Sequence, residues 1–476
     1  MEEIKSPDHR VSRRQTLKII GGSLAACATD FGLASLAWGK RGEEKRPKAP
    51  QRPNIVFILS DDHRADTMGN MGHPFVKTPN LDRIAKEGVK FTNDFAAIPL
   101  CSPSRGCFLT GQYAHRHGVK NNYTPWNDRN VTFLELLKNS GYKNAFFGKW
   151  HMPGRLPDLL GKAVDRFVTF TASGGQGLYN DCPLFIDGHL TQRKGKYLTE
   201  DLTDLALDFI RENKDGPFCV YLAHKAPHQP FVPPPALQDL YDDADAGRTL
   251  PPEYHAWIQV KEGSPYYGVL GRVVEKYLDY HRVITAMDQQ IGRVLAELDS
   301  LGIADNTVVV YTSDNGYFWG EKELIDKRFP YEEATRIPLL VRYPEKIKNP
   351  GRTSTEMALS IDMAPTLLEL AGLKVPPNVQ GISLAPILTD EKNSPHRSSV
   401  HLEYFKDFPY NVPSWDAVRT DRFLYVEYEG DKGEELFDIR NDPRTMHNLI
   451  ATPEGKGALP EMQDLMKQYL RRKSHG

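Results

Sequence analysis

Three short apolar runs in this chain each end abruptly in polar residues. Residues 54–59 precede Ser60-Asp61-Asp62, and residues 218–222 and 308–311 also stop in polar groups. A continuous β-branched and apolar run of this length is typical of a strand buried on both faces. Because open parallel sheets bind ligands at the carboxyl ends of their strands, we expect these polar groups to meet at one edge. The pattern predicts an α/β fold with a mostly parallel sheet.

Apolar residues at helical spacing lie between the expected strands. Residues 202–210 and 284–298 show this spacing, which predicts helices that flank the sheet. A further helix is expected over residues 364–370. A long surface loop, which would suit a lid over the site, is predicted for the Pro-rich residues 231–235 and the stretch 242–265.

The Pro- and Gly-rich residues 375–381 indicate a boundary between two parts of the chain. Short apolar runs and a final helix follow them, which predicts a smaller α+β unit. We therefore expect a larger domain over residues 53–374 and a smaller C-terminal subdomain over residues 375–476.

Composition excludes several classes of protein. The 476 residues include 60 Lys plus Arg against 62 Asp plus Glu, with no basic cluster, so we expect no nucleic-acid partner. Five cysteines in so long a chain do not make a disulfide scaffold, and none has the spacing of a Cys-x-x-Cys metal site.

The N-terminus carries Arg13-Arg14 ahead of a weakly apolar stretch over residues 19–38. This arrangement resembles a twin-arginine signal peptide, over residues 1–39, and implies export from a bacterial cytoplasm by the twin-arginine machinery. The alternative is a membrane-spanning anchor, but Asp30 would cost about 2.5–3.5 kcal/mol near a bilayer centre. The charged residues 40–52 predict a linker.

Two cleavage sites compete at the end of this segment. Leu24-Ala25-Ala26-Cys27 resembles a lipobox, which would leave a lipid anchor on Cys27, whereas Ala37 and Gly39 suit release of a soluble protein. The first predicts a membrane-tethered lipoprotein, and the second, which we favour slightly, a periplasmic or secreted protein.

Four oxygen-bearing residues follow two of the expected strands, namely Asp61, Asp62, Asp314 and Asn315. Adjacent carboxylates repel one another unless a cation lies between them. An all-oxygen set suits Ca²⁺ or Mg²⁺ rather than Zn²⁺. Each pair alone could equally be a turn or a helix cap.

Cys101 begins the motif Cys101-Ser102-Pro103-Ser104-Arg105. A lone cysteine here could be a buried structural thiol or a Cys-His nucleophile. The pattern Cys-x-Pro-x-Arg resembles the signature of the type I sulfatases, in which this cysteine is oxidised to Cα-formylglycine (3-oxoalanine).

Further motifs in the same order strengthen the resemblance. Gly148-Lys149-Trp150-His151 is similar to the second sulfatase signature, although Met152 and Pro153 separate His151 from the next glycine, where one residue is usual. His228 and Lys327 match the family's later histidine and lysine, with His224 as a second choice for the histidine.

Residues 53 to about 372, and more weakly residues 435–443, thus resemble a sulfatase of the alkaline-phosphatase superfamily. The resemblance implies an alkaline-phosphatase-like sheet and maturation of Cys101 by a formylglycine-generating enzyme or maturase. It also implies one cation, Ca²⁺ or Mg²⁺, held by five residues: Asp61, Asp62, formylglycine 101, Asp314 and Asn315.

The resemblance also implies a mechanism. The hydrated aldehyde at position 101, beside Arg105, would attack sulfur. Lys149 and Lys327 would meet the negative charge on the sulfuryl oxygens. His228 would protonate the leaving alcohol, and His151 would take the proton whose loss expels sulfate.

Two stretches, residues 117–125 and 316–328, resemble carbohydrate sulfatases of the N-acetylglucosamine-6-sulfatase kind, although Lys322 stands where histidine is common. A sulfated carbohydrate is therefore the expected substrate, with His224, Asn122 and Trp319 as candidate binding residues.

Two other functions stay open. Some phosphonate monoester and phosphodiester hydrolases of the superfamily use the same formylglycine. A catalytically silent, glycan-binding relative would keep the fold without the reaction. A zinc phosphatase is less expected, because we find no second set of Asp and His ligands.

Overall fold

The computed structural model describes residues 52–153, 162–170, 175–244, 273–391, 394–431 and 433–475. The predicted signal peptide, Cys27 and nearly all of the charged linker lie outside these residues, as does most of the predicted lid. Within them, no helix is both long and apolar enough to cross a membrane.

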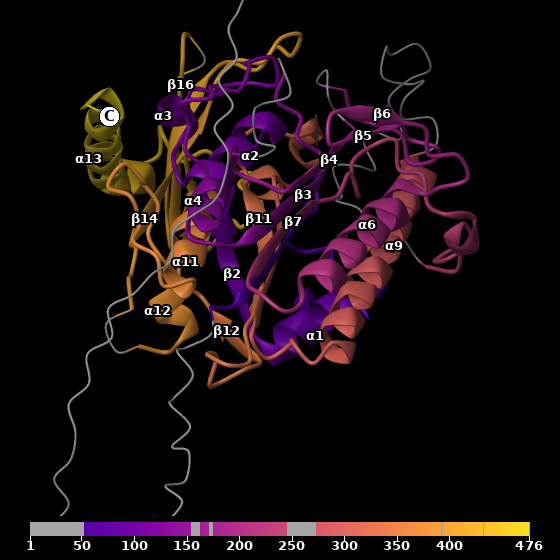
Figure 1. Cartoon of the computed structure of the whole chain (residues 1–476). Coiled ribbons are helices and arrows are strands. Elements are labelled where there is room, and N and C mark those ends of the chain that lie inside the picture. Colours follow the sequence, from indigo (N-terminus) through magenta and orange to yellow (C-terminus); the bar gives the residue numbers. More distant parts are fainter. Residues whose placement is uncertain are drawn as a thin grey trace, which may run out of the picture. The chain divides into compact units, whose positions relative to one another are not determined.

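A large mixed sheet organises the described residues (Figure 1). Its central strands β8, β1, β7, β3 and β4 run parallel to one another, and β11 pairs antiparallel with both β8 and β2. The predicted mostly parallel α/β sheet is confirmed. Its strands, in spatial order, are β12 (Arg352–Ser354), β2 (Val89–Phe95), β11 (Arg336–Arg342), β8 (Thr307–Ser313), β1 (Asn54–Ser60), β7 (Phe218–Ala223), β3 (Lys143–Gly148), β4 (Arg166–Thr169), β5 (Leu184–Ile186) and β6 (His189–Thr191), with β13 (Ala358–Leu359) beside β2.

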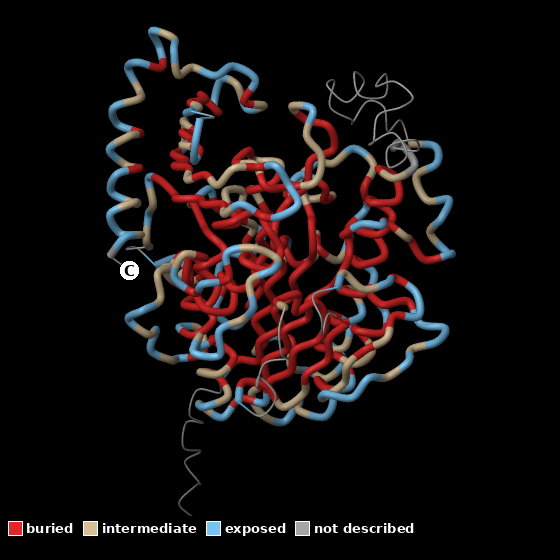
Figure 2. Tube along the Cα trace, turned by 90° about the horizontal axis from the view of Figure 1, so that it is seen from above, coloured by how far each residue is buried: buried red, intermediate tan, exposed pale blue. Residues whose placement is uncertain are grey.

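The central strand β1 is buried on both faces, as its continuous apolar sequence predicts. Val56 and Ile58 pack into one core with α1 (Pro79–Glu87), α6 (Leu198–Asn213) and α9 (Val273–Ser300). Ile55, Phe57 and Leu59 pack into the opposite core, where the helices are α2 (Cys101–Thr110), α4 (Phe133–Asn139), α11 (Met363–Leu370) and α12 (Ala385–Leu388). Figure 2 shows the buried residues concentrated in the middle, with the exposed residues around them.

A second sheet forms the C-terminal part. It is antiparallel, in the order β14 (Ser399–Tyr404), β15 (Trp415–Thr420), β16 (Phe423–Tyr428) and β17 (Glu434–Asp438). One face packs against α13 (Pro453–His475). The other face shares a hydrophobic core with residues of β2, β13 and α2. The expected smaller C-terminal α+β unit is therefore present, and β15 is a strand that the apolar pattern did not predict.

Short elements complete the described chain. The hairpin β9 (Phe318–Trp319) and β10 (Ile325–Asp326) precedes Lys327. The remaining short helices are η1 (Gly69–Met71), α3 (Ala114–His117), η2 (Pro235–Leu237), η4 (Glu321–Glu323), α10 (Glu332–Thr335) and η5 (Ser360–Asp362). Four cysteines lie in the described residues, and all four are buried and unpaired: Cys101, Cys107, Cys182 and Cys219.

Candidate active site

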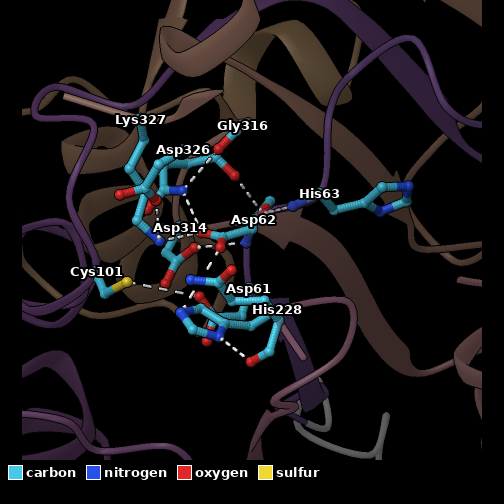
Figure 3. Close-up of polar contacts among 12 residues, drawn as sticks. Asp61, Asp62, His63, Cys101, His228, Asp314, Gly316, Asp326 and Lys327 are labelled. Carbon is cyan, nitrogen blue, oxygen red and sulfur yellow. Dashed lines mark hydrogen bonds and ion pairs between the residues drawn. The ribbon is translucent and has the colours of Figure 1, made fainter. Parts of the chain in front are cut away.

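The carboxyl ends of four adjacent parallel strands bring the predicted residues together. Ser60 at the end of β1 is in register with Ser313 at the end of β8, and Leu59 is in register with Ala223 at the end of β7. The residues that follow β1 and β8 therefore meet side by side, with those after β7 and β3 next to them. In Figure 3, Cys101, Lys327 and His228 surround the Asp61–Asp62 pair from different directions, while His63 points away.

The acidic residues form a buried cluster that suits a cation. The amide nitrogen Nδ2 of Asn315 donates to Oδ1 of Asp62 at 2.6 Å, and the backbone N–H of Asp62 donates to Oδ1 of Asp314 at 3.2 Å. Within the described part of the chain, Oδ2 of Asp62 and Oδ1 of Asn315 are buried without a hydrogen-bond partner. Buried oxygens of this kind are costly unless a donor or a metal ion satisfies them.

The two neighbouring carboxylates have different electrostatic environments. Burial and the nearby charges of Asp61 and Asp314, opposed by Lys327, together raise the pKa of Asp62 to about 7. Burial would also raise the pKa of Asp61, but Lys149, His228 and Arg105 outweigh it and hold that pKa well below its usual range. Asp61 is thus ionised at neutral pH, whereas Asp62 titrates there.

Cys101 is the first residue of α2, a helix in which every residue is buried. Its Sγ lies 3.6 Å from Oδ1 of Asp61. Burial raises the pKa of the thiol to about 12, so the unmodified side chain is a neutral thiol at pH 7. Because the thiolate is the reactive form of cysteine, this environment argues against a plain Cys-His nucleophile.

Arg105 lies one turn further along α2 and is 1% exposed. It donates to Oδ2 of Asp314 at 2.7 Å and to the carbonyl oxygen of Lys149 at 2.8 Å. The guanidinium thus fixes the start of α2 against the ends of β8 and β3.

Two buried lysines contact the carboxylate pair. The Nζ atom of Lys149, just after β3, pairs with Oδ2 of Asp61, and the Nζ atom of Lys327, just after β10, pairs with Oδ1 of Asp62. Burial would lower the pKa of Lys327, but Asp62 and its other anionic neighbours raise it well above the usual value. Two fixed positive charges therefore lie beside Cys101, as an anionic substrate group requires.

His151 is held in one orientation by two neighbours. It lies in the left-handed region, with φ 63°. The hydroxyl of Ser102 donates to the carbonyl oxygen of His151 at 2.7 Å and lies 3.2 Å from Nδ1, while Gln176 lies 2.9 Å from Nε2. The pattern assigns a proton to Nδ1 and a lone pair to Nε2. The sequence motifs gave no signal for Gln176 or for the role of Ser102.

His228 lies on the other side of the carboxylates. Its Nε2 is 3.7 Å from Oδ2 of Asp62, and its Nδ1 donates to the carbonyl oxygen of Gln229 at 2.7 Å. Burial, reinforced by Lys149, holds the pKa of His228 well below its usual range. Nε2 is therefore the atom that faces the site.

Lys225 is a buried residue that the sequence motifs did not identify. Its Nζ donates at 2.9 Å to the carbonyl oxygen of Gln229, the same oxygen that receives the bond from His228. Burial, together with the charge of Lys149, lowers the pKa of Lys225 to about 8. The lysine braces the loop that carries His228.

The three residues suggested for substrate binding lie in different surroundings. The side-chain oxygen of Asn122 accepts from the backbone N–H of Ser102 at 3.0 Å, so Asn122 borders the site. Trp319 is 5% exposed and packs in an aromatic cluster with Phe231 and Tyr280. His224 is fully buried, and burial lowers its pKa to about 3.

Arg328 follows Lys327 and extends the site toward the C-terminal sheet. Its guanidinium pairs with Asp326 and with Asp407, at 3.2 Å from Oδ2 of the latter, and lies 3.3 Å from the ring centre of Tyr410. Asp326 and Arg328 have φ values of 72° and 90°. Lys327 thus lies between two residues whose backbone is in the left-handed region.

The chain matches known families over most of its length. The profile named Sulfatase matches residues 53–373, and a second profile, N-sulphoglucosamine sulphohydrolase, C-terminal, matches residues 320–473.

Individual relatives agree with these profiles. An N-acetylglucosamine-6-O-sulfatase of Bacteroides thetaiotaomicron is 32% identical, over 92% of this chain and 88% of that protein. An ulvan-active sulfatase of Formosa agariphila is 30% identical, over 85% of this chain and 78% of its own. A solved protein in complex with its substrate D-glucosamine-2-N,6-O-disulfate has a TM-score of 0.78 at 32% identity, and the match covers 90% of this chain and 99% of that one.

Membership of this family implies a metal ion and a formylglycine. The donor atoms of Asp61, Asp62, Cys101 and His228 all lie within 4.8 Å of one another, which fits a metal site. The unpartnered oxygens of Asp62 and Asn315 fit the same purpose. We conclude that the chain belongs to the sulfatase family of the alkaline-phosphatase superfamily and is a sulfuric ester hydrolase.

Proposed function

We propose that this hydrolase removes sulfate from a sulfated carbohydrate, with 6-O-sulfated N-acetylglucosamine or a related polysaccharide unit as the substrate. The names of the relatives at 32% identity support this substrate class. The observation that carries the proposal is the position of Cys101, 3.6 Å from Asp61, beside the two carboxylates that Lys149 and Lys327 contact.

We propose that Cys101 is converted to formylglycine and that Ca²⁺, or Mg²⁺, binds beside it. The hydrated aldehyde would supply an oxygen nucleophile together with a second hydroxyl group, which a serine or cysteine lacks and whose deprotonation would expel sulfate, and the cation would neutralise charge on the substrate. Five residues would hold the cation: Asp61, Asp62, residue 101, Asp314 and Asn315.

The surrounding side chains would bind the sulfate group and move protons. Lys149 and Lys327 are already fixed by their ion pairs, so their charges need little reorganisation when a sulfuryl group arrives. His228 presents Nε2 to the site and is our candidate proton donor to the leaving alcohol; because the neutral ring carries its proton on Nδ1, this role requires that the negative charge of the bound sulfate ester raises the pKa of His228 so that Nε2 is protonated as well. His151, oriented by Ser102 and Gln176, is our candidate base at position 101.

The decisive experiment combines peptide mass spectrometry across Cys101 with an assay of sulfate release. The protein is purified from its own host or produced together with a maturation enzyme. We expect an aldehyde mass at position 101 in the wild type, and a loss of about 10³-fold or more in sulfate release for Cys101→Ala. Cys219→Ala, a change in the buried middle of β7, is the matched control.

Wild-type-like sulfate release by Cys101→Ala would overturn the mechanism. The substrate class is tested separately, with sulfated mono- and oligosaccharides beside aryl sulfates, choline sulfate and phosphate or phosphonate esters. Faster turnover of the phosphorus esters would favour the phosphonate monoester and phosphodiester alternative. Glycan binding without any sulfate release would favour the silent relative.

We further propose that the chain is exported by the twin-arginine route and reaches the periplasm or the medium. The support is the Arg13-Arg14 motif and the small-residue stretch that follows it. Replacing both arginines by lysine should leave the protein in the cytoplasmic fraction. Labelling with a radioactive fatty acid would distinguish acylation of Cys27 from soluble release.

A further inference from the structure

Three exposed aromatic rings lie on two loops at the border of the active site. Tyr123 is 60% exposed, Phe408 is 79% exposed and Tyr410 is 42% exposed. We call these three residues the aromatic rim. Large apolar side chains that are exposed together commonly mark a binding surface.

Hydrogen bonds join the two loops that carry the aromatic rim. The backbone N–H of Asn122 donates to Oδ1 of Asp407 at 3.3 Å, and Nδ2 of Asn121 donates to the carbonyl oxygen of Lys406 at 3.4 Å. Tyr123 directly follows Asn122, and Phe408 directly follows Asp407. The loop segments that carry the two most exposed rings therefore lie side by side, although they are far apart in sequence.

The same two loops are attached to the catalytic end of the sheet. Asn122 accepts from the backbone N–H of Ser102, the residue after Cys101. Asp407 pairs with Arg328, the residue after Lys327, and the guanidinium of Arg328 lies against the ring of Tyr410. The two loops that carry the aromatic rim are thus attached directly to the segments that carry Cys101 and Lys327.

We propose that the aromatic rim binds the sugar ring next to the sulfated residue, so that the enzyme favours an oligosaccharide over a monosaccharide. This inference rests on the proposed function. The apolar face of a pyranose ring stacks on an aromatic side chain, and the hydroxyl groups at its edge require polar partners. The partly exposed side chains of Asn121 and Asn122, which precede Tyr123, offer such partners, whereas Arg328 and Asp407 are buried and hold the two loops in place.

The size of the aromatic rim favours a sugar over a protein partner. A stable protein interface buries about 800 Å² on each partner and draws on about 20–30 residues a side. Three side chains on two short loops are enough for one or two sugar rings but supply only a small part of such an interface. Their attachment to the segments that carry Cys101 and Lys327 also suits a ligand that extends out of the catalytic site.

The test compares two substrates that share one sulfated residue. One is N-acetylglucosamine-6-sulfate, and the other is a tetrasaccharide that carries the same residue at its non-reducing end. For each protein we take the ratio of kcat/KM for the tetrasaccharide to kcat/KM for the monosaccharide. In the Tyr123→Ala/Phe408→Ala double variant this ratio should fall about tenfold, mainly through KM, as expected for the loss of two aromatic contacts.

Leu190→Ala is the matched control, because Leu190 is 58% exposed on β6 and the substitution also removes an exposed apolar side chain. The ratio should be unchanged in this variant. An unchanged ratio in the double variant overturns the inference and leaves the proposed function intact. A change in self-association of the double variant by ultracentrifugation, with that ratio unchanged, assigns the rings to a contact between copies and also overturns it.

Direct binding separates a failure of this inference from a failure of the proposed function. If no substrate releases sulfate, the proposed function is wrong, and calorimetry with the sulfated and the desulfated tetrasaccharide then decides the inference. Weaker binding of both by the double variant than by the wild type supports the aromatic rim as a glycan site. Equal binding by the two proteins, or no binding by the wild type, overturns it.

Discussion

Asn315 donates from its amide nitrogen to Oδ1 of Asp62 at 2.6 Å, across the boundary between β8 and β1. This bond leaves Oδ2 of Asp62 and Oδ1 of Asn315 buried and without a hydrogen-bond partner within the described chain. Two buried oxygens that lack donors, next to two further carboxylates, are an arrangement that a divalent cation stabilises.

Binding of Ca²⁺ should release protons near neutral pH. Burial raises the pKa of Asp62 to about 7 in the metal-free protein, and a cation binds only the ionised carboxylate. The affinity should therefore fall as the pH drops below 7, by up to about tenfold per pH unit for one coupled proton. Calorimetry at pH 6.5 in two buffers with different ionisation enthalpies measures the proton release.

The Asp62→Asn variant is the control for that experiment, since it keeps the size of the side chain but cannot ionise. We expect its binding to be weaker and free of this proton release. Chelation should lower the melting temperature of the wild type more than that of the variant. Equal proton release by both proteins would assign the titration to another group.

Lys149→Ala and Lys327→Ala should each lower kcat by about 10²–10³-fold. Each lysine is a buried cation held beside Cys101 by an ion pair with Asp61 or Asp62, so its loss removes charge stabilisation that solvent cannot replace. Initial rates of sulfate release measure the effect, after mass spectrometry has shown equal aldehyde content in all proteins. Activity within threefold of the wild type would exclude a direct role for that lysine.

The sequence was sufficient to predict the central strands and the residues at their ends. The apolar runs of β1, β7 and β8 are unbroken, and polar residues begin within one residue of the point where the structure ends each strand. The order of these strands in the sheet could not be predicted from the sequence. No local pattern states that β1 lies between β7 and β8, yet this order places Asp62 beside Asn315 and His228.

Other features depend on contacts between distant segments. Lys225 acts through a carbonyl oxygen, and the sequence gives no signal for which backbone oxygen a lysine will reach. Trp319 shows the opposite problem, because an aromatic residue near a motif can stack on a ligand or pack in a core. Its 5% exposure and its contacts with Phe231 and Tyr280 place it in a core.

His117 should make stability depend on pH between about 4 and 6.5. Burial lowers the pKa of its imidazole to about 4, while the unfolded chain takes up the proton near 6.5. Between these values the unfolded state binds more protons, so the free energy of unfolding falls as the pH falls, by up to about 3 kcal/mol for this group. Urea unfolding at several pH values measures it.

The His117→Phe variant should show a weaker pH dependence, because phenylalanine keeps a ring in the space against Gly106 but binds no proton. A β-carbon at Gly106 would lie 2.6 Å from Cε1 of His117, which shows how closely the ring packs there. The comparison uses the slope of the free energy of unfolding against pH. The difference in this slope between the two proteins cancels the contributions of the other titrating groups. Equal slopes would show that a group other than His117 causes the loss of stability at low pH.

Glu403 should contribute strongly to stability by joining three elements. It is fully buried in β14, accepts from the backbone N–H and from Nδ1 of His115 in α3, at 3.0 and 2.9 Å, and lies 3.2 Å from Nζ of Lys473 in α13. Burial would raise the pKa of Glu403, but His115 and Lys473 outweigh it and lower that pKa. Glu403→Ala should therefore cost about 3–5 kcal/mol, because it leaves buried donors without an acceptor.

A double-mutant cycle isolates the part of this effect that is due to Lys473. Lys473 also pairs with Asp416 at 2.7 Å, so Lys473→Met alone should cost less than Glu403→Ala. The cycle of Glu403→Gln with Lys473→Met, measured by urea unfolding, should give a coupling energy of about 1–3 kcal/mol. A coupling energy near zero would show that His115 alone neutralises Glu403, and that the end of α13 is attached to the sheet through Asp416.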